Sequence, residues 1–349
     1  MVFQRFSISK MKVGYKTSSE IINLSEQKKE MHTLKSTSLN LDTTVPIITQ
    51  HQQSMENKYL VWHIEGGLGK NVAATSLLLP LVERYPERRI VVVASYPEVF
   101  LNNPHIYRVY RVGMTPYFYD DYILGKDTLV FRQEPYFQSG HILKQKHLIQ
   151  NWADLLGLEL IQNPLPDLRF NMVQSQLTGN WKRERPICVI QTNGGPLENQ
   201  AYTYAWTRDI PIDWTIYLAN KLSDRYHIIQ VTRPGSPQIP GAEVITAHLT
   251  SSDLFSLLKM SEKRILIDSC LQHAAAAFGL HAFVLWVGTS PENFGYGLHT
   301  NIRALPPTGE TKMVDSYLFD YSFDGVLHEC PYQNVNDMFD PAHLEQILG

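Results

Sequence analysis

The sequence predicts an α/β protein with two Rossmann-like domains that follow a disordered N-terminal extension. An apolar strand, a glycine-rich turn and an amphipathic helix follow one another in residues 59–86, and a second apolar strand occupies residues 89–95. The same alternation begins again at residues 184–192 and continues to residue 288. Continuous apolar strands that alternate with helices are typical of parallel sheets covered on both faces.

The expected organisation has four parts. Residues 1–54 are rich in Ser, Thr, Lys and Gln and lack a sustained apolar period, which predicts disorder. The tail carries a helix start, with Asp340 as cap and Pro341 at the first helical position. The predicted parts are an extension over 1–54, a first Rossmann-like domain over 55–175, a second over 176–330 and a C-terminal helix within 331–349.

Composition excludes several classes of function. The 349 residues carry a formal net charge of -3, so no global basic field is available to bind nucleic acid. Cys188, Cys270 and Cys330 lie far apart without a CxxC pair, which indicates neither a metal site nor a disulfide framework. A reducing cytoplasm is therefore the expected location. No apolar run reaches the roughly 20 residues that span a bilayer, which leaves peripheral membrane contact as the open alternative.

The turn EGGLGKN, residues 65–71, is the first candidate site. A glycine turn at a helix N-terminus presents backbone N–H groups to an anion, and Lys70 adds a positive charge, although such glycines also serve tight packing alone. The GxxxxGK[ST] phosphate loop is excluded because Ile64 and Asn71 occupy two of its defining positions. The turn resembles the KGGxGK[ST] loop of ParA-type ATPases, from which Glu65 and Asn71 depart. It also resembles the GGLGD loop of GT-B glycosyltransferases, with Lys70 in place of the aspartate.

A second motif favours the glycosyltransferase. The stretch from Ile265 to Asn301 resembles a signature of glycosyltransferase family 9, the heptosyltransferase-like enzymes, and ParA-type ATPases have no counterpart to it. The matching positions are Asp268, Ser269, Cys270, His273, Ala275, Ala277, Gly279, Gly288, Thr289, Ser290, Pro291, Gly295, Tyr296 and Gly297. With a further similar run after the glycine turn, the resemblance covers roughly residues 59–112 and 184–303.

The resemblance implies a GT-B fold, in which the two domains face each other across a cleft. The domain 55–175 would hold the acceptor and the domain 176–330 the nucleotide sugar. It implies an inverting, metal-independent transfer of a heptose or other hexose-like sugar from a nucleotide-diphosphate donor, without a cofactor. The acceptor would be a glycan, a cell-surface group or a lipid-linked glycan, as in the biosynthesis of lipopolysaccharide or other glycans.

Donor-binding residues are expected at the carboxyl ends of the strands in the second domain. Ligands of open α/β sheets bind there, and helix N–H groups and hydroxyls would hold the diphosphate. The alternatives are a helix cap for Asp268, a packing histidine for His273, a buried thiol for Cys270 and a surface charge for Arg208. The candidates are Asp268, Ser269, Cys270 and His273 from the signature and, by position in the family, Thr192, Asn193 and Arg208.

The catalytic base is the main difficulty. In the family it is commonly the aspartate of the glycine turn, where this chain has Lys70, and a protonated lysine cannot accept a proton. Glu65 is the preferred replacement and His63 the second, although Glu65 would alternatively pair with Lys70. Because the aspartate is missing, a non-catalytic module that binds a nucleotide or glycan remains an alternative. The predicted acceptor-side loop comprises Gly66, Gly67 and Gly69.

Overall fold

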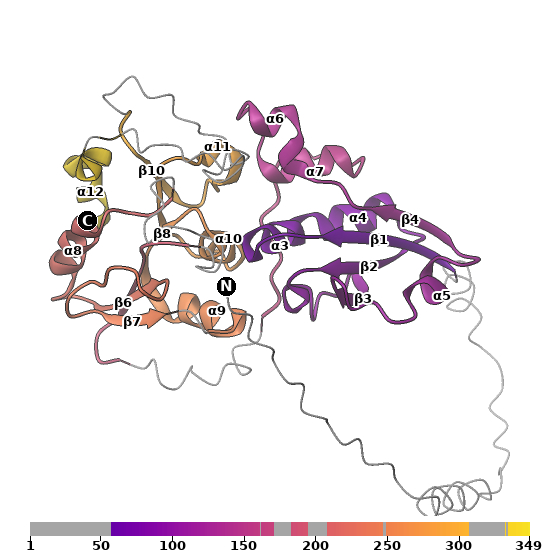
Figure 1. The fold of residues 1–349 in the computed structure, drawn as a ribbon, viewed down its shortest axis with the longest axis horizontal. Coiled ribbons are helices and arrows are strands. Elements are labelled where there is room, and N and C mark those ends of the chain that lie inside the picture. The colour runs from indigo at the N-terminus through magenta and orange to yellow at the C-terminus, as the bar shows by residue number, and fades with distance from the viewer. Residues whose placement is uncertain are drawn as a thin grey trace, which may run out of the picture. The chain divides into compact units, whose positions relative to one another are not determined.

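The computed structural model describes residues 57–160, 162–170, 183–194, 208–246, 249–306, 332 and 334–349 (Figure 1). The extension expected over 1–54 lies outside these residues, as does the boundary expected between residues 175 and 176. Both therefore remain predictions.

The first sheet has four parallel strands in the order β3-β2-β1-β4. The strands are β1 (Lys58–Ile64), β2 (Arg89–Ala94), β3 (Ile106–Arg111) and β4 (Asp127–Phe131). β1 lies in the middle, between β2 and β4 (Figure 1). The strands expected at residues 59–64 and 89–95 are thus confirmed, whereas β3 and β4 have weaker apolar patterns and were not anticipated.

Both faces of β1 are buried, as the continuous apolar run predicts. Leu60 and Trp62 belong to the larger core, together with residues of α3 (Leu68–Ala74), α4 (Leu78–Arg84) and α7 (Leu148–Leu155). Tyr59 and Val61 pack on the other face with residues of α5 (Phe118–Tyr122). Successive side chains of a strand point to opposite faces of the sheet, so neighbouring residues of β1 contribute to two different cores.

The helix expected over residues 72–86 is interrupted. α3 ends at Ala74, a 3₁₀ turn occupies Thr75–Leu77, and α4 follows. Pro80 lies in the first turn of α4, where its missing N–H costs little, whereas within one long helix it would remove a hydrogen bond and clash with the preceding turn. The hydroxyls of Thr75 and Ser76 donate to the carbonyls of Val72 and Ala73, which satisfies backbone groups at the break.

The second sheet has six parallel strands in the order β10-β9-β8-β5-β6-β7. They are β5 (Ile187–Gln191), β6 (His227–Thr232), β7 (Glu243–Thr246), β8 (Ser261–Ile267), β9 (Phe283–Trp286) and β10 (Thr300–Arg303). The order reverses between β5 and β8, which is the kind of position where doubly wound sheets bind ligands.

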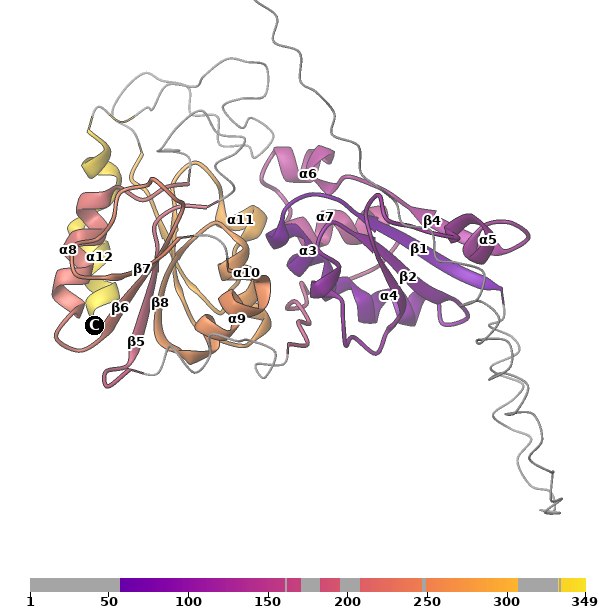
Figure 2. The same cartoon turned by 60° about the horizontal axis from the view of Figure 1, so that its bottom comes forward.

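Helices cover both faces of this sheet (Figures 1 and 2). α8 (Ile212–Leu222) and α12 (Pro341–Leu348) pack against each other on one face. α9 (Ser251–Met260) and α10 (Cys270–Ala277) lie on the other. The neighbours Ile265 and Leu266 of β8 accordingly belong to different cores. The predicted α/β class with two parallel sheets is confirmed.

The start of α12 is confirmed at the level of single contacts. The Asp340 carboxylate accepts a hydrogen bond from the backbone N–H of Ala342 at 2.8 Å, and Pro341 occupies the first helical turn. Leu344 and Ile347 of this helix are fully buried in the core that also contains Ile265 of β8. The C-terminal helix therefore packs against the second sheet.

A short helical segment after β4 was not anticipated. It comprises a 3₁₀ turn at Pro135–Phe137, α6 (Ser139–Ile142) and α7. Asn293 of α11 (Pro291–Phe294) donates from its side-chain amide to the His141 carbonyl at 2.7 Å. This segment thus joins the first sheet to the signature region of the second. Every described helix is too short or too polar to cross a membrane.

Candidate functional site

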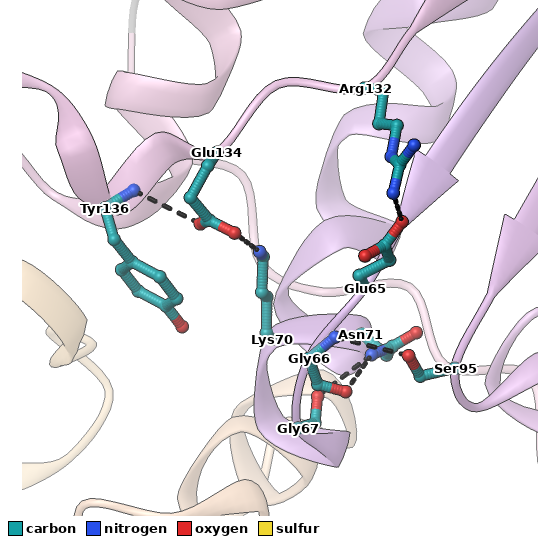
Figure 3. A network of polar contacts seen from close by, with 9 residues as sticks. All are labelled: Glu65, Gly66, Gly67, Lys70, Asn71, Ser95, Arg132, Glu134 and Tyr136. Carbon is teal, nitrogen blue, oxygen red and sulfur yellow. Dashed lines mark hydrogen bonds and ion pairs between the residues drawn. The ribbon is translucent and has the colours of Figure 1, made fainter. Parts of the chain in front are cut away.

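The glycine turn connects β1 to α3 and is held by side chains. Gly66 has a φ of 105°, a backbone conformation that side chains disfavour, and its N–H donates to the Ser95 hydroxyl at 3.2 Å. The Asn71 amide donates to the carbonyls of Gly66 and Gly67 at 3.3 and 2.9 Å (Figure 3). Asn71 therefore supports the turn from within, which accounts for an amide where a phosphate loop would carry a hydroxyl.

Lys70 is buried and paired. Its ammonium lies 2.5 Å from the Glu134 carboxylate, and its side chain is 5% exposed whereas that of Glu134 is 34% exposed. The ammonium is also 5.0 Å from the ring centre of Tyr136 and 5.4 Å from that of Trp152. Such distances allow cation–π attraction. Figure 3 shows Lys70 pointing from α3 toward Glu134.

Glu65 does not pair with Lys70, so that sequence-based alternative is wrong. It forms an ion pair of 2.8 Å with Arg132, and the two side chains are 44% and 68% exposed. His63 lies on the face of β1 that α5 covers, with its ring 6.2 Å from that of Phe118. Burial lowers the pKa of His63, Arg132 lowers it further, and Glu65 opposes them.

The second candidate site is the start of α10. Ser269 caps this helix: its hydroxyl accepts from the Leu271 N–H at 3.2 Å and donates to the Gln191 amide oxygen at 2.6 Å. Asp268 precedes it and is 5% exposed, and its Oδ2 atom has no hydrogen-bond partner. Burial raises the pKa of Asp268, against the opposing influence of Arg208 and Thr289. A buried acceptor without a partner is costly in a finished structure, and a hydrogen-bond donor on a ligand is one group that would satisfy it.

Thr192 and Asn193 lie at the carboxyl end of β5 but are engaged with β6. The Asn193 amide donates to the Thr232 hydroxyl at 2.9 Å and accepts from the Arg233 N–H at 2.7 Å. The Thr192 hydroxyl accepts from the Gln230 amide at 3.1 Å. Both side chains therefore hold the carboxyl end of β5 against that of β6. The positive charge of Arg208 favours the ionised form of Asp268 and so lowers the pKa of that carboxyl, against the effect of burial.

His273 and Cys270 are held by burial in their uncharged forms. The His273 Nδ1 atom lies 2.8 Å from the Tyr296 hydroxyl. Burial, with His147 and His299 nearby, lowers the pKa of His273 to about 3. Burial raises the pKa of the Cys270 thiol to about 12, which excludes a thiolate nucleophile at neutral pH. The Cys270 side chain nevertheless keeps an intermediate solvent exposure, so the alternative of a buried thiol stays a prediction.

The two candidate sites touch each other. A Cβ atom at Gly69 would lie 3.0 Å from His273 Cδ2 and 3.3 Å from the backbone nitrogen of Cys270. A side chain there would force the first turn of α3 away from the first turn of α10. The glycine turn and the aspartate–serine loop, about 200 residues apart in the sequence, are therefore brought together by packing.

Sequence reasoning missed a cluster of buried histidines beside this contact. His141, His147 and His299 join His273, and each is less than a tenth exposed. Burial lowers the pKa of His141, His147 and His299 to about 4. The Asn293 amide nitrogen donates to the His141 carbonyl and also lies 3.0 Å from His141 Nδ1. An amide NH₂ group can only donate, so Nδ1 is the acceptor. Isolated histidines without a recognisable spacing gave no signal in the sequence.

Across the described residues, His, Cys, Asp and Glu side chains form no cluster that could hold a metal ion. The candidate site has three parts: the cluster of buried, uncharged histidines, the N-terminus of α10 with Asp268, whose pKa Arg208 influences, and the ion pair of Lys70 with Glu134. Such a site can bind an anion at the helix start and present a carboxylate beside it.

The fold is that of GT-B glycosyltransferases. No protein-family model matches the sequence, and no curated protein matches it. Among solved structures, a family 9 glycosyl transferase from Veillonella parvula aligns with a TM-score of 0.56 at 13% identity, over 84% of this chain and 98% of that one.

Two enzymes from Escherichia coli have a similar fold. ADP-heptose lipopolysaccharide heptosyltransferase II has a TM-score of 0.56 at 14% identity, over 83% of this chain and 98% of its own. The iron-containing dodecameric glycosyltransferase TibC has a TM-score of 0.58 at 14% identity, over 84% and 75%. At these identities the likeness is one of fold, and it confirms the fold that the sequence resemblance implied.

Proposed function

We propose that the protein is a glycosyltransferase that uses a nucleoside-diphosphate sugar as donor. The proposal rests mainly on one observation: the N-terminus of α10, with the unpartnered Asp268 oxygen, packs against the glycine turn. The fold shared with family 9 and heptosyltransferase structures supports the same class. The sugar would be a heptose or hexose, and the acceptor a glycan or lipid-linked glycan on the side of the glycine turn.

The donor diphosphate is placed at the start of α10. Backbone N–H groups and the helix dipole there favour a negative charge, and the Arg208 guanidinium adds a charged donor for phosphate oxygens. Asp268 would accept a hydrogen bond from a donor hydroxyl, while Thr192 and Asn193 shape the loop. Stabilising the departing diphosphate by fixed groups would allow inversion at the anomeric carbon without a metal. A cytoplasmic location belongs to the same proposal.

Calorimetry on the purified chain tests the donor site. We expect binding of at least one of ADP, UDP and GDP or their sugars. Asp268→Asn should weaken donor-sugar binding by roughly 10- to 100-fold, which corresponds to about 1.5–3 kcal/mol for one charge-assisted hydrogen bond. Asp224→Asn, at an exposed carboxylate of the same sheet domain, is the control. Absence of any binding would refute the proposal.

The alternative is a binding module without catalysis. Its support is that the turn position where relatives carry a base is Lys70, whose ammonium is already held by Glu134. Such a module would bind the nucleotide sugar without releasing the nucleoside diphosphate from it. Release of nucleoside diphosphate with transfer of the sugar to a supplied acceptor would exclude this alternative.

A further inference from the structure

The glycine turn presents a carboxylate that the sequence does not place there. Lys70 occupies the expected position of the acidic group, but its side chain is 5% exposed and its ammonium contacts Glu134 at 2.5 Å. Glu134, with 34% of its side chain exposed, is the accessible member of the pair. What faces a ligand at this turn is therefore a carboxylate supplied from the segment after β4.

Glu134 is fixed at both carboxylate oxygens. Oε2 contacts the Lys70 ammonium, and Oε1 accepts from the Tyr136 N–H at 3.4 Å, as cap of the 3₁₀ turn (Figure 3). The rings of Tyr136 and Trp152 hold the ammonium in place. A catalytic group gains from such fixation because it need not be reoriented when substrate arrives.

The carboxylate also lies near the candidate donor site. Lys70 directly follows Gly69, where an added Cβ atom would lie 3.0 Å from His273 Cδ2 and 3.3 Å from the first backbone nitrogen of α10. A Cβ atom at Gly67 would meet nothing within 4 Å, so there is open space beside the turn in which an acceptor could be placed.

The two residues that the sequence favoured as the catalytic base, Glu65 and His63, are less well placed than Glu134. Glu65 is paired with Arg132 on the surface, 2.8 Å apart, with 44% and 68% of the two side chains exposed. His63 packs on the α5 face of β1, whereas α3 and Lys70 lie on the opposite face. Glu134, by contrast, is paired with Lys70 of α3, the helix that packs against α10.

Resting on the function proposed above, we propose that Glu134 is the general base of the transfer and that Lys70 is its positioning residue. The acceptor oxygen forms a bond to the anomeric carbon of the donor, and its proton passes to a Glu134 oxygen. The bond between the anomeric carbon and the diphosphate oxygen breaks, and its electron pair leaves on the diphosphate. Glu134 then returns the proton to water.

The test measures release of nucleoside diphosphate from ADP-, UDP- and GDP-linked sugars, with water or a supplied glycan as the acceptor. Glu134→Gln should lower kcat by about 10²- to 10⁴-fold, the usual contribution of a general base. Donor affinity, measured by calorimetry, should stay within a few fold. Glu65→Gln tests the rival carboxylate, and Glu83→Gln, at an exposed carboxylate of α4, is the control that should keep kcat within a few fold.

Lys70→Met and the double variant Lys70→Met/Glu134→Gln complete the set. Because Lys70 acts through Glu134, the double variant should lose no more activity than Glu134→Gln alone, whereas independent effects would multiply. The double variant also removes the buried ammonium together with its partner. It therefore replaces Glu134→Gln if that single variant does not fold, as judged by its Tm.

Full activity in Glu134→Gln, or in the folded double variant, would overturn the assignment of the base. Loss of activity in Glu65→Gln with activity kept in Glu134→Gln would assign the base to Glu65 instead. Multiplicative losses in the double variant would overturn the role of Lys70. A wild-type protein that binds no nucleotide sugar would refute the proposed function itself, which is a different result from activity that survives the loss of Glu134.

Discussion

The buried histidine cluster predicts a specific weakness toward acid, and His141 provides the sharpest test. Its Nδ1 atom lies 3.0 Å from the Asn293 amide nitrogen, which donates to it. Protonation of Nδ1 would therefore place two donors against each other in a buried site. Burial, with His147 nearby, lowers the pKa of His141 to about 4 from its ordinary 6.5.

The sign of the effect follows from linkage. The unfolded chain binds this proton below pH 6.5 and the folded chain only below about pH 4, so the unfolded state gains protons first as the pH falls. The contribution of His141 is present above pH 6.5 and is lost between pH 6.5 and about 4. Between pH 7 and pH 5 the loss of folding free energy is about 2 kcal/mol, out of a maximum of about 3 kcal/mol.

The assay is urea unfolding at several pH values between 7 and 5 for wild type and His141→Asn. Asparagine keeps an acceptor near the position of Nδ1 but does not titrate. We expect the variant to lose about 2 kcal/mol less than wild type over this range, whatever its stability at pH 7. His343→Asn, at an exposed histidine of α12, is the control and should follow wild type. A variant curve parallel to that of wild type would refute the reasoning.

Two further predictions concern packing and reactivity in the signature region. Gly295→Ala should lower the stability by about 1–3 kcal/mol, measured by thermal or urea unfolding, because its Cβ would lie 2.7 Å from the Pro291 carbonyl oxygen. Gly297→Ala, where nothing lies within 4 Å of the added carbon, is the control, and equal losses in the two variants would contradict the explanation. Cys270, whose pKa burial raises to about 12, should resist iodoacetamide at pH 7 in the folded protein and react in urea. Rapid alkylation of the folded protein, located by mass spectrometry, would contradict this.

Much of the fold was readable from local sequence. The runs YLVWHI and RILID predicted β1 and β8 because their continuous apolar character suits strands buried on both faces. Asp340 and Pro341 predicted the start of α12 because caps depend on neighbouring residues only. The interruption of the first helix before Pro80 was readable from the same kind of signal and was overlooked.

The contacts within the candidate site were less predictable. The motif residues Asp268 and Ser269 lie at the start of α10, as the sequence resemblance implied. Their roles in donor binding remain predictions. The alternative in which Glu65 pairs with Lys70 was wrong, because an ion pair depends on spatial proximity, and Glu134 lies 64 residues away from Lys70 in the sequence. The histidine cluster gave no sequence signal for the same reason.

The sequence by itself determined two parallel sheets, a glycine turn and an aspartate–serine loop at a helix start, because periodicity, turns and caps are encoded by neighbouring residues. Tertiary packing decided that Gly69 meets Cys270 and that a carboxylate from beyond β4 covers the buried ammonium of Lys70. Burying a charge is costly without a partner, and only the assembled fold determines which carboxylate comes within reach.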